Sequence, residues 1–199
     1  AEDGIRDLAS SLVGSEMCIR DRYHKRHLVP FGEYLPFDRW TRPVLDFLRI
    51  PMSDFAPGGN GKPLITLAGY PVGVDICYED AYGEEIIRAL PEAALLINAS
   101  NDAWFGDSLA PHQHLEIARM RALETGRYLL RATNTGISAI IDERGGLRDT
   151  SPQFEKAILS DEILPMSGVT PFAFWGNRAV LALAGLMLAF GLWRQRAGD

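Results

Sequence analysis

Residues 71–100 read PVGVDICYEDAYGEEIIRALPEAALLINAS, and this stretch decides the fold class of the chain. It opens on a strand pattern, PVGVDICYE (71–79), continues with a helix pattern, GEEIIRAL (83–90), and closes on a second strand pattern, AALLINAS (93–100). The last segment is almost continuously apolar, as expected of a strand buried on both faces. Strand and helix patterns that alternate at such short spacing favour an α/β protein over an α+β protein.

The alternation continues on both sides of this stretch. Upstream, LITLAG (64–69) reads as a strand, and downstream PHQHLEIARMRALETGR (111–127) reads as a helix. The apolar spacing of that helix predicts a buried stripe, made of Leu115, Ala118 and Ala122 with Leu123 at its margin. Three further strands are predicted at 128–134, 137–143 and 156–163.

The composition restricts what such a domain can do. With 199 residues, 47% hydrophobic and 23% charged, the chain has room for one ordinary domain plus a short appendage, and disorder is excluded. A net charge of -6 argues against a surface for nucleic acid, so no nucleic-acid partner is predicted. Two cysteines cannot build a disulfide framework.

Residues 23–63 predict ordered loops. Six prolines recur there every six to eight residues and interrupt any long helix, although a short amphipathic stretch is expected at 41–50. The run PGGNGKP (57–63) does not qualify as a phosphate loop, because Pro63 stands where Ser or Thr would bind magnesium.

The C-terminal zone predicts one transmembrane helix. FAFWGNRAVLALAGLMLAFGLW (172–193) has a tryptophan near each end, and its last 15 residues contain no polar side chain. Two arginines in the tail 194–199 predict that this tail is cytoplasmic and that the α/β domain lies on the outer side. The alternative, a buried helix of a soluble domain, is disfavoured because the segment has no polar face.

Cys77 is the first candidate for chemistry. It lies at the carboxyl end of a predicted strand, just before Tyr78, Glu79 and Asp80, and sites in α/β sheets form beyond such ends. A second polar run at 100–102 follows the next strand, which suggests one shared rim. The alternative is a buried structural cysteine, and position alone does not decide between the two.

A catalytic thiol at Cys77 would need a cation or base from elsewhere in the chain, because neighbouring carboxylates disfavour the thiolate. The densest basic cluster is HKRH (24–27), which can equally be a solvated charge run. The four histidines, at 24, 27, 112 and 114, lack a supporting cysteine pair, so neither a metal nor a cofactor is predicted.

Three segments together resemble the nitrilase superfamily: YHKRHLVPFGEYLPF (23–37), VDICYEDAYGEE (74–85) and the run at 98–142 that contains NDAWFG and TNTGISA. Within it they are similar to the bacterial apolipoprotein N-acyltransferase family of the inner membrane. The resemblance implies a partial nitrilase-type α-β-β-α sandwich over residues 23–165, with a periplasmic catalytic domain.

The resemblance also implies a role for six residues. They are Cys77 as nucleophile, Lys25 as the triad lysine, Glu33 and Glu79 as supporting carboxylates, and Tyr78 and Trp104 at the acyl and lipid site. An acyl chain would move from a phospholipid to Cys77 as a thioester, and then to the amino terminus of a diacylglyceryl apolipoprotein. The implied partners are therefore the phospholipid donor, the apolipoprotein acceptor and the membrane.

The upstream part of the family pattern is missing from this sequence. The triad's glutamate base would precede Tyr23, where Glu2 and Glu16 stand in the wrong setting. Residues 1–22 do not resemble the family, and SLVGSEMCIRD (11–21) resembles translated sequencing adapter. We interpret residues 1–22 as an artefactual segment and the chain as an N-terminally truncated piece.

Two other functions are open at this point. A soluble carbon–nitrogen hydrolase would use water as the second acceptor, but it needs neither the apolar tail nor the bulky Trp104-Phe105 loop. A membrane-tethered binding module without activity is the alternative from another class, since the base is not found in the sequence.

Overall fold

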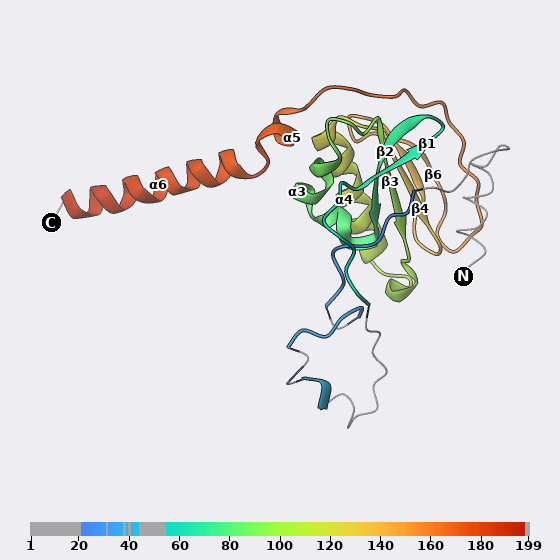
Figure 1. Ribbon diagram of the computed structural model, residues 1–199, viewed down its shortest axis with the longest axis horizontal. Helices are drawn as coiled ribbons and strands as arrows, with labels where there is room; N and C mark the ends of the chain where they lie inside the picture. The colour runs from blue at the N-terminus through green and yellow to red at the C-terminus, as the bar shows by residue number, and fades with distance from the viewer. Residues whose placement is uncertain (1–20, 31, 38, 40, 44–54, 198–199) are drawn as a thin grey trace.

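The computed structural model describes residues 21–30, 32–37, 39, 41–43 and 55–197 (Figure 1). Most of the amphipathic stretch expected at 41–50 and the whole of segment 1–20 lie outside these residues.

One mixed sheet of six strands forms the centre of the described chain. Its strands lie in sequence order. They are β1 (Leu64–Leu67), β2 (Tyr70–Ile76), β3 (Leu95–Ser100), β4 (Leu129–Thr133), β5 (Ala139–Ile141) and β6 (Leu147–Thr150). The three strands β2, β3 and β4 are parallel, whereas the outer pairings are antiparallel. The carboxyl ends of the parallel strands therefore meet at one edge, where sites of α/β sheets form.

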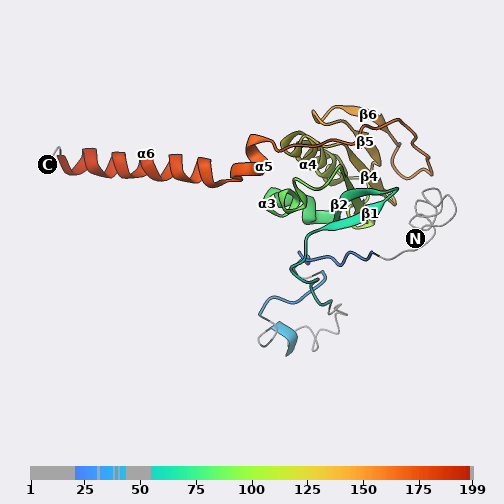
Figure 2. The ribbon, with the colours of Figure 1, turned by 45° about the horizontal axis from the view of Figure 1, so that its top comes forward.

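Helices cover one face of this sheet. Figures 1 and 2 show α3 (Gly83–Ile86) and α4 (Ala110–Thr125) on the same side of it. Leu96 packs into the core on the helical side, while its neighbour Leu95 packs on the opposite face with Val72 and Tyr128. Successive side chains of a strand point to opposite faces, so β3 is buried on both sides, as its apolar sequence predicted.

The sequence predicted the α/β class and most elements correctly. The α/β class is confirmed, and the buried stripe of α4 contains Leu115, Ala118 and Ala122, although Leu123 is 51% exposed. The described residues contain a single sheet, so the second sheet of the predicted sandwich is not among them.

The strand predicted at 156–163 is wrong. This segment pairs with no strand among the described residues, and β6 forms the sheet edge instead. The reason is the turn after β5: Asp142 accepts hydrogen bonds from the N–H groups of Arg144 and Gly146, and Gly145 adopts a φ of 77°. This turn folds β6 straight back on β5, which leaves residues 156–163 beyond the hairpin.

The predicted transmembrane helix at 172–193 is not confirmed. The segment is divided into α5 (Pro171–Trp175) and α6 (Arg178–Ala197), because α5 ends at Gly176 with a φ of 55°. Within the described chain, no helix has the length and apolar character needed to cross a membrane. The uncharged part of α6, 179–193, rises about 1.5 Å per residue and so covers less than the roughly 30 Å of a hydrocarbon core.

Candidate functional site

Cys77 occupies a strained elbow between β2 and the short 3₁₀ helix η1 (Cys77–Ala81). The strand predicted to run to residue 79 ends at Ile76, and Cys77 adopts a φ of 56°. A side chain in this left-handed region is strained and persists only when its surroundings hold it there. The elbow presents a half-buried thiol at the carboxyl edge of the sheet, which is the arrangement of a nucleophile on a strand-to-helix turn.

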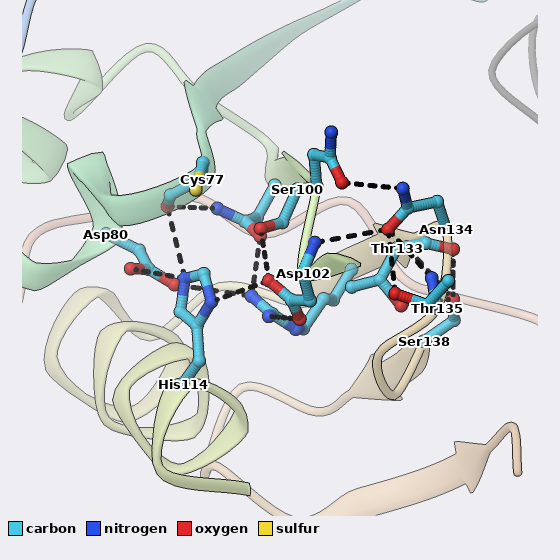
Figure 3. A network of polar contacts seen from close by, with 12 residues as sticks. Cys77, Asp80, Ser100, Asp102, His114, Thr133, Asn134, Thr135 and Ser138 are labelled. Atoms are coloured by element: carbon cyan, nitrogen blue, oxygen red, sulfur yellow. Dashed lines mark hydrogen bonds and ion pairs between the residues drawn. The ribbon is translucent and has the colours of Figure 1, made fainter. Parts of the chain in front are cut away.

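Two side chains hold the carbonyl oxygen of Cys77. Asn98 of β3 donates from Nδ2 at 3.1 Å, and Nε2 of His114 on α4 lies at 3.2 Å. Figure 3 shows His114 pointing from α4 toward Cys77, between Asp80 and Asp102. The elbow is therefore attached to a neighbouring strand and to a helix.

A buried ionic cluster lies directly behind the elbow and consists of Asp80, Asp102, His114 and Arg131. His114 Nδ1 lies 3.2 Å from Asp102 Oδ1, and its Nε2 lies 3.1 Å from Asp80 Oδ1. The guanidinium of Arg131 donates to Asp102 Oδ2 at 2.9 Å and pairs with Asp80 Oδ2 at 3.5 Å. Two carboxylates and two cations thus neutralise one another away from water, as buried charges require.

His114 is charged in this setting. Burial alone would lower the pKa of His114, but the hydrogen bonds to Asp102 and Asp80 outweigh it and raise the pKa from 6.5 to about 9. The pKa of Asp102 is lowered although burial opposes ionisation, because His114, Ser100 and Arg131 stabilise its charge. His114 and Asp102 are therefore an ionised pair at neutral pH.

Asp75 of β2 behaves differently from these carboxylates. Its burial and the neighbouring Asp80 carboxylate raise the pKa of Asp75 well above the usual value, although Asn98 donates a hydrogen bond to it. The neutral form of Asp75 is thus favoured in this setting more than that of an exposed carboxyl group.

Lys25 forms a close ion pair with Glu33. Lys25 Nζ donates to both carboxylate oxygens of Glu33 at 2.7 Å, and the N–H of Val29 donates to Glu33 at 2.8 Å. The lysine side chain is only 11% exposed. Lys25 and Glu33 are therefore direct partners, and the role of Glu33 as a supporting carboxylate stays a prediction.

Glu79 joins the lysine segment, residues 23–27, to the elbow. None of its hydrogen bonds among the described residues is to Lys25. Its carboxylate accepts from the Tyr23 hydroxyl at 2.8 Å and from the N–H groups of Arg26 at 2.6 Å and His27 at 3.1 Å. It also accepts from the N–H of Ile76 at 2.8 Å. The sequence predicted Glu79 as a supporting carboxylate, and in the structure its carboxylate holds the backbone on both sides of the site.

Aromatic side chains lie on the solvent side. Tyr78 and Tyr82 share a hydrogen bond of 2.7 Å, and the ring of Tyr82 stacks on His27 at 4.3 Å. Trp104 lies in the 3₁₀ helix η3 (Ala103–Phe105) and is 84% exposed. The structure thus places Tyr78 beside the elbow and leaves Trp104 as an apolar surface residue.

Sequence reasoning considered His114 only as a metal ligand and missed its place behind Cys77. Its neighbours come from residues 12 to 37 positions away, which no local pattern reveals. One signal was present: His114 directly precedes Leu115 in the apolar stripe of α4. Among the described residues, no group of three or more His, Cys, Asp or Glu side chains has the arrangement of a metal site.

Comparison with known proteins identifies the family to which the chain is similar. The family described as Carbon-nitrogen hydrolase matches residues 10–168, so the match begins inside the segment 1–22 that we interpreted as lying outside the family.

Curated relatives share one name. The chain is 51% identical over 175 residues to an apolipoprotein N-acyltransferase of Methylococcus capsulatus, covering 88% of this chain and 35% of that protein. It is 54% identical over 169 residues to the protein of that name from Nitrosomonas europaea, covering 85% of this chain and 34% of the relative. The chain thus spans about a third of the length of these relatives.

Proposed function

The chain belongs to the carbon–nitrogen hydrolase family, and from this premise we propose that it is the nucleophile-bearing part of an apolipoprotein N-acyltransferase. Its fold is the α/β fold of nitrilase type, with the mixed six-stranded sheet described above. The observation that carries the proposal is Cys77 in its left-handed elbow, tied through Glu79 to the segment of Lys25. The shared name of the relatives supplies the reaction class.

The first half-reaction forms a thioester on Cys77. The sulfur attacks the ester carbonyl carbon of a phospholipid, the S–C bond forms, and the ester C–O bond breaks to release a lysophospholipid that takes up a proton. The ammonium of Lys25, oriented by Glu33, would stabilise the tetrahedral oxyanion together with the N–H of Tyr78.

The second half-reaction transfers the acyl chain to an amine. The α-amino group of a diacylglyceryl-cysteine attacks the thioester carbonyl, an amide forms, and the thiol of Cys77 is regenerated with a proton from the amine. A carboxylate base from the upstream part of the protein would accept the thiol proton in the first half-reaction and pass it to the leaving lysophospholipid oxygen. In the second half-reaction the same base would carry the amine proton to the thiolate.

Exposed apolar side chains on the surface of the protein are the proposed lipid contacts. Trp104 is 84% exposed and Phe37 is 82% exposed, while the apolar side chains of α6 are exposed along its length. Figure 1 shows α6 extending away from the sheet. We assign these surfaces to the lipid phase of the bacterial inner membrane, with the catalytic domain on the periplasmic side.

The test is a chimera in which residues 23–199 replace the matching region of the Methylococcus capsulatus relative. Incubated with phosphatidylethanolamine and a diacylglyceryl lipopeptide, it should yield an N-acylated lipopeptide, and Cys77→Ser should abolish the product. Release of free fatty acid in place of lipopeptide acylation would show a hydrolase with water as the acceptor and would contradict the proposal.

A further inference from the structure

We propose that His114 and Asn98 are positioning residues, which hold the Cys77–Tyr78 peptide so that the Tyr78 N–H faces the reacting carbonyl as an oxyanion donor. This inference rests on the proposed function, because it assigns the device that prepares the acyl-transfer site. It concerns side chains that contact the elbow from inside the protein and have no place in the half-reactions above.

The direction of the Tyr78 N–H follows from the geometry of the Cys77–Tyr78 peptide group. Both contacts to the carbonyl oxygen of Cys77 come from inside the protein, from Asn98 at 3.1 Å and His114 at 3.2 Å. In a planar trans peptide the C=O and the following N–H point in opposite directions. Fixing the carbonyl inward therefore directs the N–H of Tyr78 away from the cluster.

The orientation of Asn98 is itself determined. Its side-chain oxygen accepts a hydrogen bond of 2.7 Å from Nη1 of Arg131, so its amide nitrogen is left to donate to Cys77. Arg131 is fully buried at its side chain and is fixed in turn by Asp102 at 2.9 Å. A flipped amide would set an N–H group against a guanidinium, which excludes the opposite orientation.

His114 can serve only as a donor in its position. Its Nδ1 faces Asp102 and its Nε2 faces Asp80 and the Cys77 carbonyl, so every polar neighbour in these contacts is an acceptor. A neutral imidazole would place a lone pair against one of these oxygens, whereas the imidazolium donates at both nitrogens. A charge-assisted donor binds the carbonyl more firmly than a neutral one.

The titratable and charged groups around His114 come from the elements that pack against α4 at the elbow. Asp80 belongs to η1, Asp102 follows β3, Arg131 lies on β4, and Asp75 on β2 is reached through Asn98. The two anions balance the two cations, so His114 can hold the elbow without adding net charge beside the thiol. The position of the oxyanion donor is thus set before substrate binds, which is the condition for strong electrostatic catalysis.

The experiment compares two reactions of the Cys77 thiol in the full chain carrying Cys18→Ser. Acylation by p-nitrophenyl acetate forms an S–C bond, breaks the ester C–O bond and releases p-nitrophenolate through a tetrahedral oxyanion, with the thiol proton going to the buffer. Alkylation by iodoacetamide is a displacement that develops no oxyanion. Peptide mass mapping gives the rate constant of each reaction. Both reactions start from the thiolate, so the fraction of thiolate cancels in the ratio of the two rate constants, and the ratio reports the stabilisation of the oxyanion.

His114→Leu is expected to lower this ratio about 10- to 1,000-fold, because the Tyr78 N–H loses its orientation and complete loss of an oxyanion donor sets the upper end of this range. His114→Gln keeps a donor toward the carbonyl and should retain the ratio within about three-fold, while Asn98→Ser should lower it several-fold. His112→Leu, an exposed histidine two residues earlier on α4, is the matched control and should leave it unchanged.

The outcomes separate this inference from the proposed function. An unchanged ratio in folded Asn98→Ser or His114→Leu would overturn the positioning role, and circular dichroism establishes that each variant is folded. Should His114→Leu fail to fold, the ratio in folded Asn98→Ser still decides the question. Because the probe is a small activated ester, the ratio is measurable even if the chimera never acylates a lipopeptide.

Discussion

At the scale of single residues, the site depends on small groups that leave room for the ionic cluster. Gly136 is the clearest case, because a Cβ built there would lie 2.2 Å from Asp102 Oδ2 and 2.9 Å from its Cβ. No real Cβ atom tolerates such a contact with a fixed neighbour, and Asp102 is fixed by His114 and Arg131. The glycine is therefore part of the structure behind Cys77.

Gly136→Ala should lower the free energy of unfolding by about 1–3 kcal/mol, because Asp102 must move out of its hydrogen bonds. Urea unfolding followed by fluorescence measures this change. Gly61→Ala is the matched control, since nothing lies within 4 Å of a Cβ at that position. Equal effects of the two substitutions would contradict the packing described here.

The charge of His114 makes stability depend on pH. Its pKa is raised from 6.5 to about 9 in the folded chain, so its stabilising contribution is complete below pH 6.5 and is lost as pH rises through 9. A shift of this size corresponds to a contribution on the order of 3 kcal/mol. Between pH 6 and pH 10, the wild-type chain should therefore lose more unfolding free energy than His114→Gln.

Urea unfolding at the two pH values provides the measurement for both chains. Asp75 and the other titrating groups are common to them and cancel in the difference. His112→Gln, which changes an exposed histidine of the same helix, should follow the wild type. If the wild type and His114→Gln lose the same unfolding free energy, His114 is not held as a cation.

At the scale of elements, the junction between β2 and η1 joins two distant parts of the chain. Glu79 accepts hydrogen bonds from the backbone of Arg26, His27 and Ile76, so one carboxylate ties the lysine segment to the strand end. Glu79→Gln should cost about 2–4 kcal/mol, because an amide group would turn donors toward donors at a buried position.

Hydrogen exchange locates this effect. The amides of Arg26 and His27 should exchange faster in Glu79→Gln, while the amides of β3 keep their protection. Glu92→Gln, which removes an exposed partner of Lys62, is the control and should leave both segments unchanged. Unaltered exchange at Arg26 and His27 would show that other contacts hold the lysine segment.

Some of these elements could be predicted from the sequence and others could not. Continuous apolar runs and helical spacing located β3 and α4, because burial on both faces or along one stripe leaves a local pattern. The strand that contains β5 was predicted, but β6 was missed, because the four residues of this edge strand are all exposed and show no apolar alternation. Cys77 could be proposed from its strand end, but the contacts of His114 and Arg131 depend on tertiary packing and have no local signal.

At the scale of the whole molecule, α6 presents apolar side chains to the surroundings. Leu186 and Met187 are each more than two-thirds exposed. Leu186→Glu should reduce co-sedimentation with phosphatidylethanolamine vesicles several-fold, because a charge opposes burial of that surface in lipid. Ile158→Glu, at a 94% exposed apolar residue outside α6, should have little effect. Equal loss for both variants would assign vesicle binding to general hydrophobicity.

The central claim is that Cys77 accepts the acyl chain. The direct measurement is mass spectrometry of the chimera, incubated with phosphatidylethanolamine of defined chains and no lipopeptide acceptor. We predict a thioester adduct on the peptide that contains Cys77, with the mass of the donor acyl chain, which disappears with hydroxylamine and when lipopeptide is added. An adduct on another residue, or acyl transfer that persists in Cys77→Ser, would contradict the account.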